Sequence, residues 1–251
     1  MPDRPSRQEL FITTRSILEP PRGVHTRMLD LAEALLPGLG ASYLAPRLGR
    51  YAYAIQASVG EGLAAFQLID EFEEDGARHL YLGPLFSRGG AAGPLVAGFL
   101  LGLLAEARPF HLMTEVENPE VALMVKALFP RSSCPDLVSL AIPAETRRIA
   151  SAFSRRLGHI ESLDLETLAT RPGESLYVPR PGCEPVLRWL EERRVHLDAG
   201  HSQAFLITCG DPARQGPGMR AELLHGLRCF GQWALWRPRL MALFERHAHV
   251  A

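Results

Sequence analysis

A glycine-rich turn between an apolar strand and a long apolar helix constrains the fold of this chain more than any other feature. The strand is predicted at residues 77–86, the turn at residues 87–93 reads SRGGAAG, and the helix follows with Pro94 in its first turn. The first N–H groups of a helix lack intrahelical partners and carry positive potential, so a phosphate binds there when side chains stay clear. The turn therefore predicts an anion-binding loop, to which Arg88 can add a charge-assisted hydrogen bond.

Upstream of this turn, the hydrophobic pattern predicts a strand, one helix and then three antiparallel strands. The helix places Val24, Met28 and Leu31 on one face and ends at Pro37. A turn at Gly60-Glu61-Gly62 joins the next two strands into a hairpin. The predicted segments are residues 10–17, 24–36, 51–60, 62–76 and 77–86.

Downstream, a strand at residues 110–117 leads into a helix at residues 119–129, which Asn118 should cap and in which Pro119 occupies the first turn. We expect strands at 137–142 and 204–209, helices at 143–158, 183–197 and 219–249, and loops at 171–182 and 210–218. The predicted fold class is α/β (α+β), a mixed and mostly antiparallel sheet flanked by helices, with a helical C-terminal extension.

Composition excludes several classes of protein. The 251 residues are 47% hydrophobic and 22% charged, and a net charge of -1 offers no field for binding nucleic acid. The longest apolar run is interrupted by Pro94 and is too short for a membrane span. Four scattered cysteines and an N-terminus without an apolar signal core predict a cytoplasmic protein, and the Arg, Ala and Gly bias suggests a bacterial source. No spacing typical of a zinc site is present.

At the glycine-rich turn the chain resembles the GCN5-related N-acetyltransferase (GNAT) superfamily. The acyl-CoA loop of that family has Arg or Gln, two residues, Gly or Ala, one residue, and Gly or Ala, and Arg88, Ala91 and Gly93 match this spacing. Asn118 and Ala122 match an Asn after the fifth strand and an Ala on the following helix. The resemblance covers residues 10–130 and implies a GNAT fold, with one initial helix where the family often has two.

The resemblance implies direct attack of an amine on the thioester of acetyl-CoA or another acyl-CoA, without a metal. The acceptor would be a small-molecule or peptide amine, and the assembly, a homodimer among the options, stays open. The implied domains are an acyl-CoA-binding core at residues 1–145 and, at residues 146–251, the completion of the sheet plus a helical extension that binds the acceptor or forms an interface. The implied cofactor-binding residues are Leu85, Phe86, Arg88, Gly89, Gly90, Ala91, Ala92, Gly93 and Asn118.

The catalytic residues are less directly implied, because the chain departs from the family at one position. Many members carry a Tyr seven residues after the Asn, where it protonates the leaving thiolate, and this chain has Val125 there. Tyr81 is our candidate for that acid, and a carboxylate or His should take the proton of the attacking ammonium. The candidates by position are Tyr81, Glu117 and His79, followed by Asp70, Glu71 and Glu115.

Two alternatives to N-acyl transfer follow from the same departures. The first alternative is a GNAT-like protein that has lost transfer activity and acts as a binding or scaffold protein. It is favoured by Val125 and by a shortened loop, in which only Phe86 and Ser87 separate the strand from Arg88. The residues after Pro130 could instead form a docking surface of a GNAT-like enzyme that acts on carrier-bound or CoA thioesters. Acetyl-CoA should raise the melting temperature if the loop still binds it, and should not if the loop has lost this function.

Overall fold

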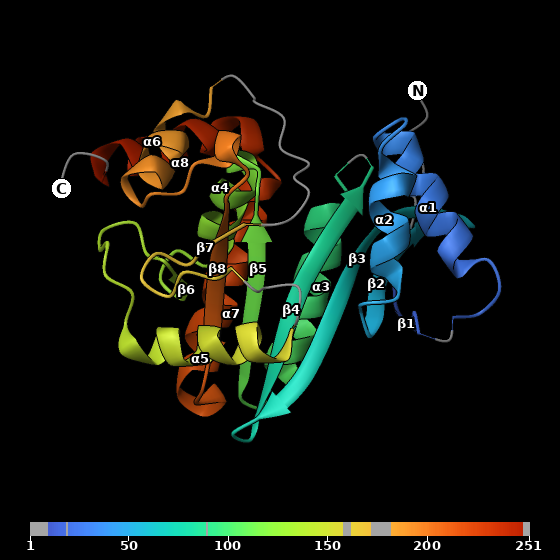
Figure 1. The fold of residues 1–251 in the computed structure, drawn as a ribbon, viewed down its shortest axis with the longest axis horizontal. Helices are drawn as coiled ribbons and strands as arrows, with labels where there is room; N and C mark the ends of the chain where they lie inside the picture. Colours follow the sequence, from blue (N-terminus) through green and yellow to red (C-terminus); the bar gives the residue numbers. More distant parts are fainter. Residues whose placement is uncertain (1–9, 19, 89, 158–161, 172–181, 248–251) are drawn as a thin grey trace, which may run out of the picture. The chain divides into compact units, whose positions relative to one another are not determined.

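The computed structural model describes residues 10–18, 20–88, 90–157, 162–171 and 182–247 (Figure 1). The chain divides into two compact units, and the division falls within β3, β4 and α3. The N-terminal unit comprises residues 1–71 and 82–102, and the C-terminal unit comprises residues 72–81 and 103–251. The helices are α1 Val24–Leu35, α2 Gly40–Leu48, α3 Ala92–Ala105, α4 Pro119–Leu128, α5 Ala144–Arg156, α6 Glu184–Glu192, α7 Pro212–Phe230 and α8 Trp233–His247.

The strands form one sheet with the order β1-β2-β3-β4-β5-β8-β6, and β7 also pairs with β8. Strand pairs β1–β2, β2–β3, β5–β8, β6–β8 and β7–β8 are all antiparallel. Such a sheet flanked by helices confirms the predicted fold class. The strands are β1 Leu10–Ser16, β2 Tyr53–Val59, β3 Gly62–Glu74, β4 Ala77–Ser87, β5 Phe110–Val116, β6 Ser133–Cys134, β7 Ala169–Thr170 and β8 Ser202–Cys209.

The N-terminal unit contains the predicted hairpin. Val59 pairs with Gly62 across a two-residue turn, and Gly60 has a φ of +58°. A residue with a positive φ in a two-residue hairpin loop is usually Gly or Asn, so the local sequence explains this turn. Further along the hairpin, the buried ring of Phe66 in β3 stacks on that of Phe86 in β4, with ring centroids 5.3 Å apart.

The prediction of one initial helix is wrong, because α2 follows α1. The Glu33 carboxylate of α1 accepts hydrogen bonds from the backbone N–H groups of Gly38 and Ala41. These bonds lower the pKa of Glu33. They also satisfy donors at the start of α2, which otherwise lacks a side-chain cap. The pattern did not reveal α2, because its cap comes from another helix and Pro46 lies inside it.

Close packing of α1 against α2 makes Gly40 sensitive to substitution. A Cβ atom at this position would lie 2.0 Å from the backbone oxygen of Ala32. We expect Gly40→Ala to reduce the free energy of unfolding by about 1–3 kcal/mol, as for other overpacked sites, measured by urea denaturation. Gly49→Ala is the matched control, because nothing lies within 4 Å of its added Cβ. Equal stability of the two variants would contradict the packing argument.

The C-terminal unit is built on the long pairing of β5 with β8, which joins Phe110 to Cys209 and Val116 to Gln203. Helices α4, α6 and α8 contribute to one apolar cluster of this unit. At its centre Trp189 stacks on Phe205 and meets Phe244 edge-on, with ring centroids 6.2 and 5.3 Å apart. The predicted strand at 204–209 is confirmed as part of β8.

The predicted strand at residues 137–142 is wrong, because side chains take the backbone groups that a strand would use. The Asp136 carboxylate accepts the N–H groups of Val138 and Ser139 at 2.8 and 2.6 Å. Arg193 donates to the carbonyl oxygens of Ser139 and Leu140. Val138 is 65% exposed, so no apolar face is buried either. The strand in this region is instead the two-residue β6.

The predicted loop at residues 210–218 is also wrong, since α7 begins at Pro212. Asp211 caps the helix by accepting the N–H of Arg214 at 3.2 Å, and Gln215 accepts the Asp211 N–H at 2.9 Å. This reciprocal capping supports a helix through Gly216 and Pro217. Residues 172–181 of the other predicted loop lie outside the described residues. No described helix is long and apolar enough to cross a membrane.

Candidate active site

Tyr81 and Glu115 form a hydrogen-bonded pair within the C-terminal unit. The Tyr81 hydroxyl donates to the Glu115 carboxylate at an oxygen–oxygen distance of 2.6 Å. Tyr81 is only 4% exposed, and Glu115 is partly buried. A short O–H to carboxylate bond of this kind is stronger than a neutral one and orients both groups. The pair therefore joins a potential proton donor to a potential proton acceptor.

Burial raises the pKa of the Glu115 carboxyl group. The hydrogen bond from Tyr81 opposes this effect, while the nearby charge of Glu117 adds to it. A carboxylate with a raised pKa holds a proton more readily near neutral pH, which suits a general base. Glu117 itself is partly exposed, one residue before Asn118.

His79 lies in a cluster of aromatic rings and is only 3% exposed. Its ring centroid is 4.7 Å from Phe72, 5.4 Å from Phe153 and 4.9 Å from His111. Burial lowers the pKa of His79 and lowers that of His111 to about 4. Both rings are therefore neutral at neutral pH, and the surroundings of His79 are those of a packed core.

Helix α5 carries both an apolar residue of this cluster and exposed ion pairs. Phe153 packs on His79, while Arg148 pairs with Asp75 at 2.7 Å and Arg155 with Glu74 at 2.7 Å. The arginines of α5 therefore meet acidic groups of the same unit. Exposed pairs of this kind contribute little to stability.

The glycine-rich loop lies in the N-terminal unit and opens α3, as predicted. The Arg88 side chain and Gly90 are exposed, and the Arg88 N–H donates to the Ala64 carbonyl at 2.9 Å. Gly90 has a φ of +83°, which an L side chain rarely adopts. Ala92 and Gly93 form the first residues of α3. Gly89 lies outside the described residues.

The other residues with an implied cofactor role differ in accessibility. Phe86 is buried on Phe66, so only its backbone could serve a ligand, and Leu85 is partly buried. Asn118 caps α4, as predicted, by accepting the Glu120 N–H at 3.0 Å. The side-chain oxygen of Asn118 is thus engaged, while its side-chain NH₂ group can still donate.

Val125 belongs to the apolar cluster around Trp189 and is 9% exposed. Ala122, one turn earlier, is fully buried in the same cluster. The position that carries a Tyr in many GNAT proteins is therefore a packing position here. Nothing at Val125 can donate a proton.

The structure pairs residues that sequence reasoning could only place on strand faces. Alternation predicted that residues 79 and 81 share a face, as do 115 and 117, but not that Tyr81 meets Glu115. His111 was missed, because a lone His in an apolar strand carries no motif. Among the described residues, no three His, Cys, Asp or Glu side chains are placed to hold a metal ion.

Comparison with known proteins matched this chain to solved structures only. No protein-family profile matches the chain, and no curated protein matches it. A ribosomal-protein-alanine N-acetyltransferase from Brucella melitensis biovar Abortus is 16% identical over 68% of this chain and 99% of its own, with a TM-score of 0.31. A GNAT family acetyltransferase from Brucella melitensis in complex with acetyl-CoA is 14% identical over 41% and 75%, with a TM-score of 0.27.

A third solved structure, the NatC complex bound to a Gag peptide and CoA, is 12% identical over 80% of this chain and 99% of its own. Its TM-score is 0.34. All three TM-scores are below 0.5, so the resemblance to the GNAT superfamily rests on the loop residues and Asn118.

Proposed function

We propose that this protein is an N-acyltransferase that moves an acetyl or other acyl group from acyl-CoA to an amine. The Tyr81–Glu115 pair carries the proposal, because it supplies a base with a raised pKa and an acid in direct contact. The GNAT resemblance supplies the reaction class and the site of the cosubstrate. The acceptor is a small-molecule or peptide amine.

In this proposal the amine nitrogen attacks the thioester carbonyl carbon, so that a C–N bond forms and the C–S bond breaks. Glu115 takes a proton from the attacking nitrogen, and Tyr81 gives its own proton to the departing sulfur. Glu115 then returns a proton to Tyr81 through their 2.6 Å hydrogen bond. The net transfer moves one proton from nitrogen to sulfur and restores both residues.

The loop at residues 88–93 would hold the pyrophosphate of the cosubstrate. The start of α3 offers backbone N–H groups, and the exposed Arg88 offers a charge. Asn118 can use its amide NH₂ on the pantetheine arm while its oxygen caps α4. Residues 1–145 would then bind acyl-CoA, and residues 146–251 would complete the sheet and bind the acceptor or form an interface. Homodimer formation and a cytoplasmic location stay predictions.

Substitution of Gly90 should weaken binding of CoA. A Val at φ +83° is strained, so the loop would move, and we expect the Kd for CoA to rise at least about tenfold, or 1.4 kcal/mol. Isothermal titration calorimetry measures this change. Gly102→Ala in α3 is the matched control, because nothing lies within 4 Å of its Cβ and it should leave the Kd unchanged. An unchanged Kd in folded Gly90→Val would remove the loop from the site.

The burial of Val125 favours one second candidate, a GNAT-like binding protein without transfer activity. Two measurements separate the candidates. Acetyl-CoA should raise the melting temperature in both, because ligand binding stabilises the folded state. Only the enzyme releases free CoA thiol when acetyl-CoA is incubated with a panel of primary amines and peptides. Thermal stabilisation without thiol release across that panel would favour the binding protein.

A further inference from the structure

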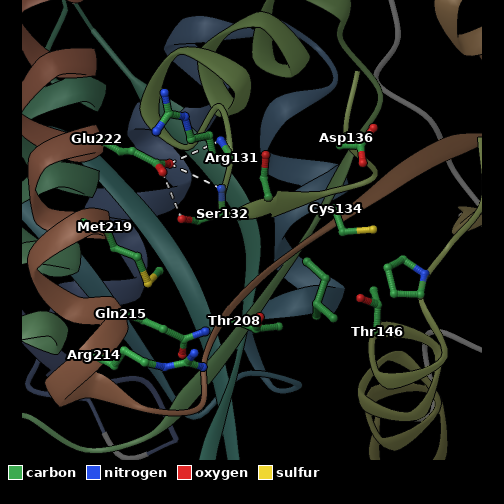
Figure 2. A pocket seen from close by; sticks show the side chains of 14 residues that line it. Arg131, Ser132, Cys134, Asp136, Thr146, Thr208, Arg214, Gln215, Met219 and Glu222 are labelled. Atoms are coloured by element: carbon green, nitrogen blue, oxygen red, sulfur yellow. Dashed lines mark hydrogen bonds between the residues drawn. The ribbon is translucent and has the colours of Figure 1, made fainter. Parts of the chain in front are cut away.

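A cavity lies within the C-terminal unit, and none of the proposed acyl-transfer residues lines it. It has a volume of about 450 Å³. Residues around β6, the start of α5, β8 and α7 line it (Figure 2). Its wall is mostly hydrogen-bonding side chains, with Pro143, Leu206 and Met219 as apolar members. Cys134, Thr146, Arg214 and Gln215 lie around the open space in Figure 2.

The two carboxylates of the cavity wall are already used as acceptors. Glu222 accepts from the backbone N–H of Ser132 at 3.3 Å and from its hydroxyl at 3.2 Å, and from the N–H of Arg131 (Figure 2). Asp136 accepts two backbone N–H groups, those of Val138 and Ser139. These bonds hold the connection around β6 in place and leave the carboxylates poorly suited to bind an added cation.

Two buried cations lie behind the same wall. Lys126, the only lysine in the chain, is 2% exposed and donates to the Ser133 carbonyl and hydroxyl at 3.0 and 2.9 Å. Arg193 is 3% exposed, and its Nε has no hydrogen-bond partner. Neither forms an ion pair with a described residue. Lys126 reaches the cavity wall directly, because Ser133 lines the cavity. Arg193 donates to the carbonyl oxygens of Ser139 and Leu140, which follow the wall residue Asp136 in the chain.

Further positive potential comes from side chains and helix ends at the cavity. Arg131 and Arg214 line it, and Arg214 lies 3.6 Å from Asp211 in a highly exposed pair. The basic groups at or near the cavity are therefore four, namely Arg131, Arg214, Lys126 and Arg193. The acidic groups are three, namely Asp136, Glu222 and Asp211. The first turn of α5 also lines the cavity, through Thr146, and no side chain caps the start of that helix. Its N–H groups add positive potential.

We propose that this cavity binds a small organic anion, one that carries a carboxylate or phosphate on a hydroxylated body. The excess of basic groups selects the negative charge, and the hydroxyl and amide groups of Thr146, Thr208 and Gln215 suit hydroxyl partners. Arg214 would contact the anion at the rim. This ligand is distinct from acyl-CoA, so the proposal stands or falls independently of acyl transfer.

Cys134 provides a readout at the site itself. It is partly exposed, whereas Cys183, Cys209 and Cys229 are buried. The rate at which N-ethylmaleimide modifies Cys134 at pH 7.4, followed by peptide mass spectrometry, should fall at least fivefold with saturating citrate or inorganic phosphate. Sodium chloride at equal ionic strength serves as the reference, and putrescine serves as a cation of similar size.

A matched pair of substitutions in α7 tests the location. Arg214→Gln should raise the concentration of citrate needed for half-protection at least fivefold. Arg220→Gln removes the same charge from an exposed residue outside the cavity and should leave that concentration unchanged. Any of three results would overturn the proposal. These are no protection by either anion at about 10 mM, a concentration that would saturate a site with a Kd near 1 mM, equal effects of the two variants, and protection by putrescine but not by either anion.

Discussion

Replacement of Tyr81 by Phe is expected to lower the turnover of acyl transfer by about 10²- to 10⁴-fold. The Phe ring fills the same space, so the fold and the Kd for CoA should persist. The hydroxyl that donates to Glu115 at 2.6 Å is lost, and with it the proton for the leaving sulfur. Steady-state release of CoA thiol, together with a melting curve of each variant, measures the effect.

The chain contains a natural control for this substitution. Tyr53 also donates its hydroxyl to a glutamate, Glu71, at 3.0 Å, but within the N-terminal unit. The proposed proton transfers do not use the Tyr53 hydroxyl, so Tyr53→Phe should keep turnover near that of the wild type. Full activity of Tyr81→Phe, or an equal loss in both variants, would exclude Tyr81 as the acid.

The pH profile of the same enzyme reports on Glu115. The base must be deprotonated, so kcat/KM should fall as the pH drops through the raised pKa of Glu115. The hydrogen bond from Tyr81 lowers this pKa, so Tyr81→Phe should move the acidic limb to higher pH. A limb at the same pH in both proteins would show that another group is the base.

The second large effect is an expected loss of stability in acid that depends on His111. Its pKa falls from 6.5 to about 4 on folding, mainly through burial. The unfolded chain therefore binds a proton between these values and the folded chain does not, so stability is complete above pH 6.5 and declines toward pH 4. The expected loss is about 3 kcal/mol, from 1.36 kcal/mol per pKa unit.

His111→Phe should remove most of this slope, because a phenyl ring can join the cluster of Phe72, His79 and Phe153 without a charge. The Nδ1 of His111 has no hydrogen-bond partner, so little is lost with it. Urea denaturation at steps between pH 7 and pH 4 gives the slope. His225→Phe, at an exposed histidine, is the control and should leave it as in the wild type. Identical slopes in all three proteins would contradict this role of His111.

Features that depend on neighbours in the chain were predictable. The turn at Gly60, the cap at Asn118 and the small residues that open α3 each rest on contacts a few residues apart. Such contacts require particular residue types at fixed spacings, and these can be recognised in the sequence. The alternation of strands and helices likewise follows from periodicity, which is why the fold class was accessible.

Errors arose where a distant side chain replaces a local partner. Glu33 caps α2 across the turn after α1, and Arg193 holds the carbonyl groups of Ser139 and Leu140 from 54 and 53 residues away. Arg193 lies too far along the chain for a sequence window to include its partners, and Glu33, although only 5 and 8 residues from Gly38 and Ala41, belongs to the preceding helix. Periodicity registers neither kind of contact, so it suggested a strand at 137–142 and no helix at 40–48.

The sequence by itself determined most of the strands and helices, the glycine-rich loop and the cap of α4, because local backbone preferences and side-chain spacing decide these. Only the tertiary structure decided that Tyr81 pairs with Glu115, that His79 and His111 share a buried cluster, and that Lys126 is buried against Ser133 of the cavity wall. The sheet brings together residues that lie 34 positions apart in the case of Tyr81 and Glu115. Burial, which sets the charge state of such groups, depends on the whole packed unit rather than on any segment.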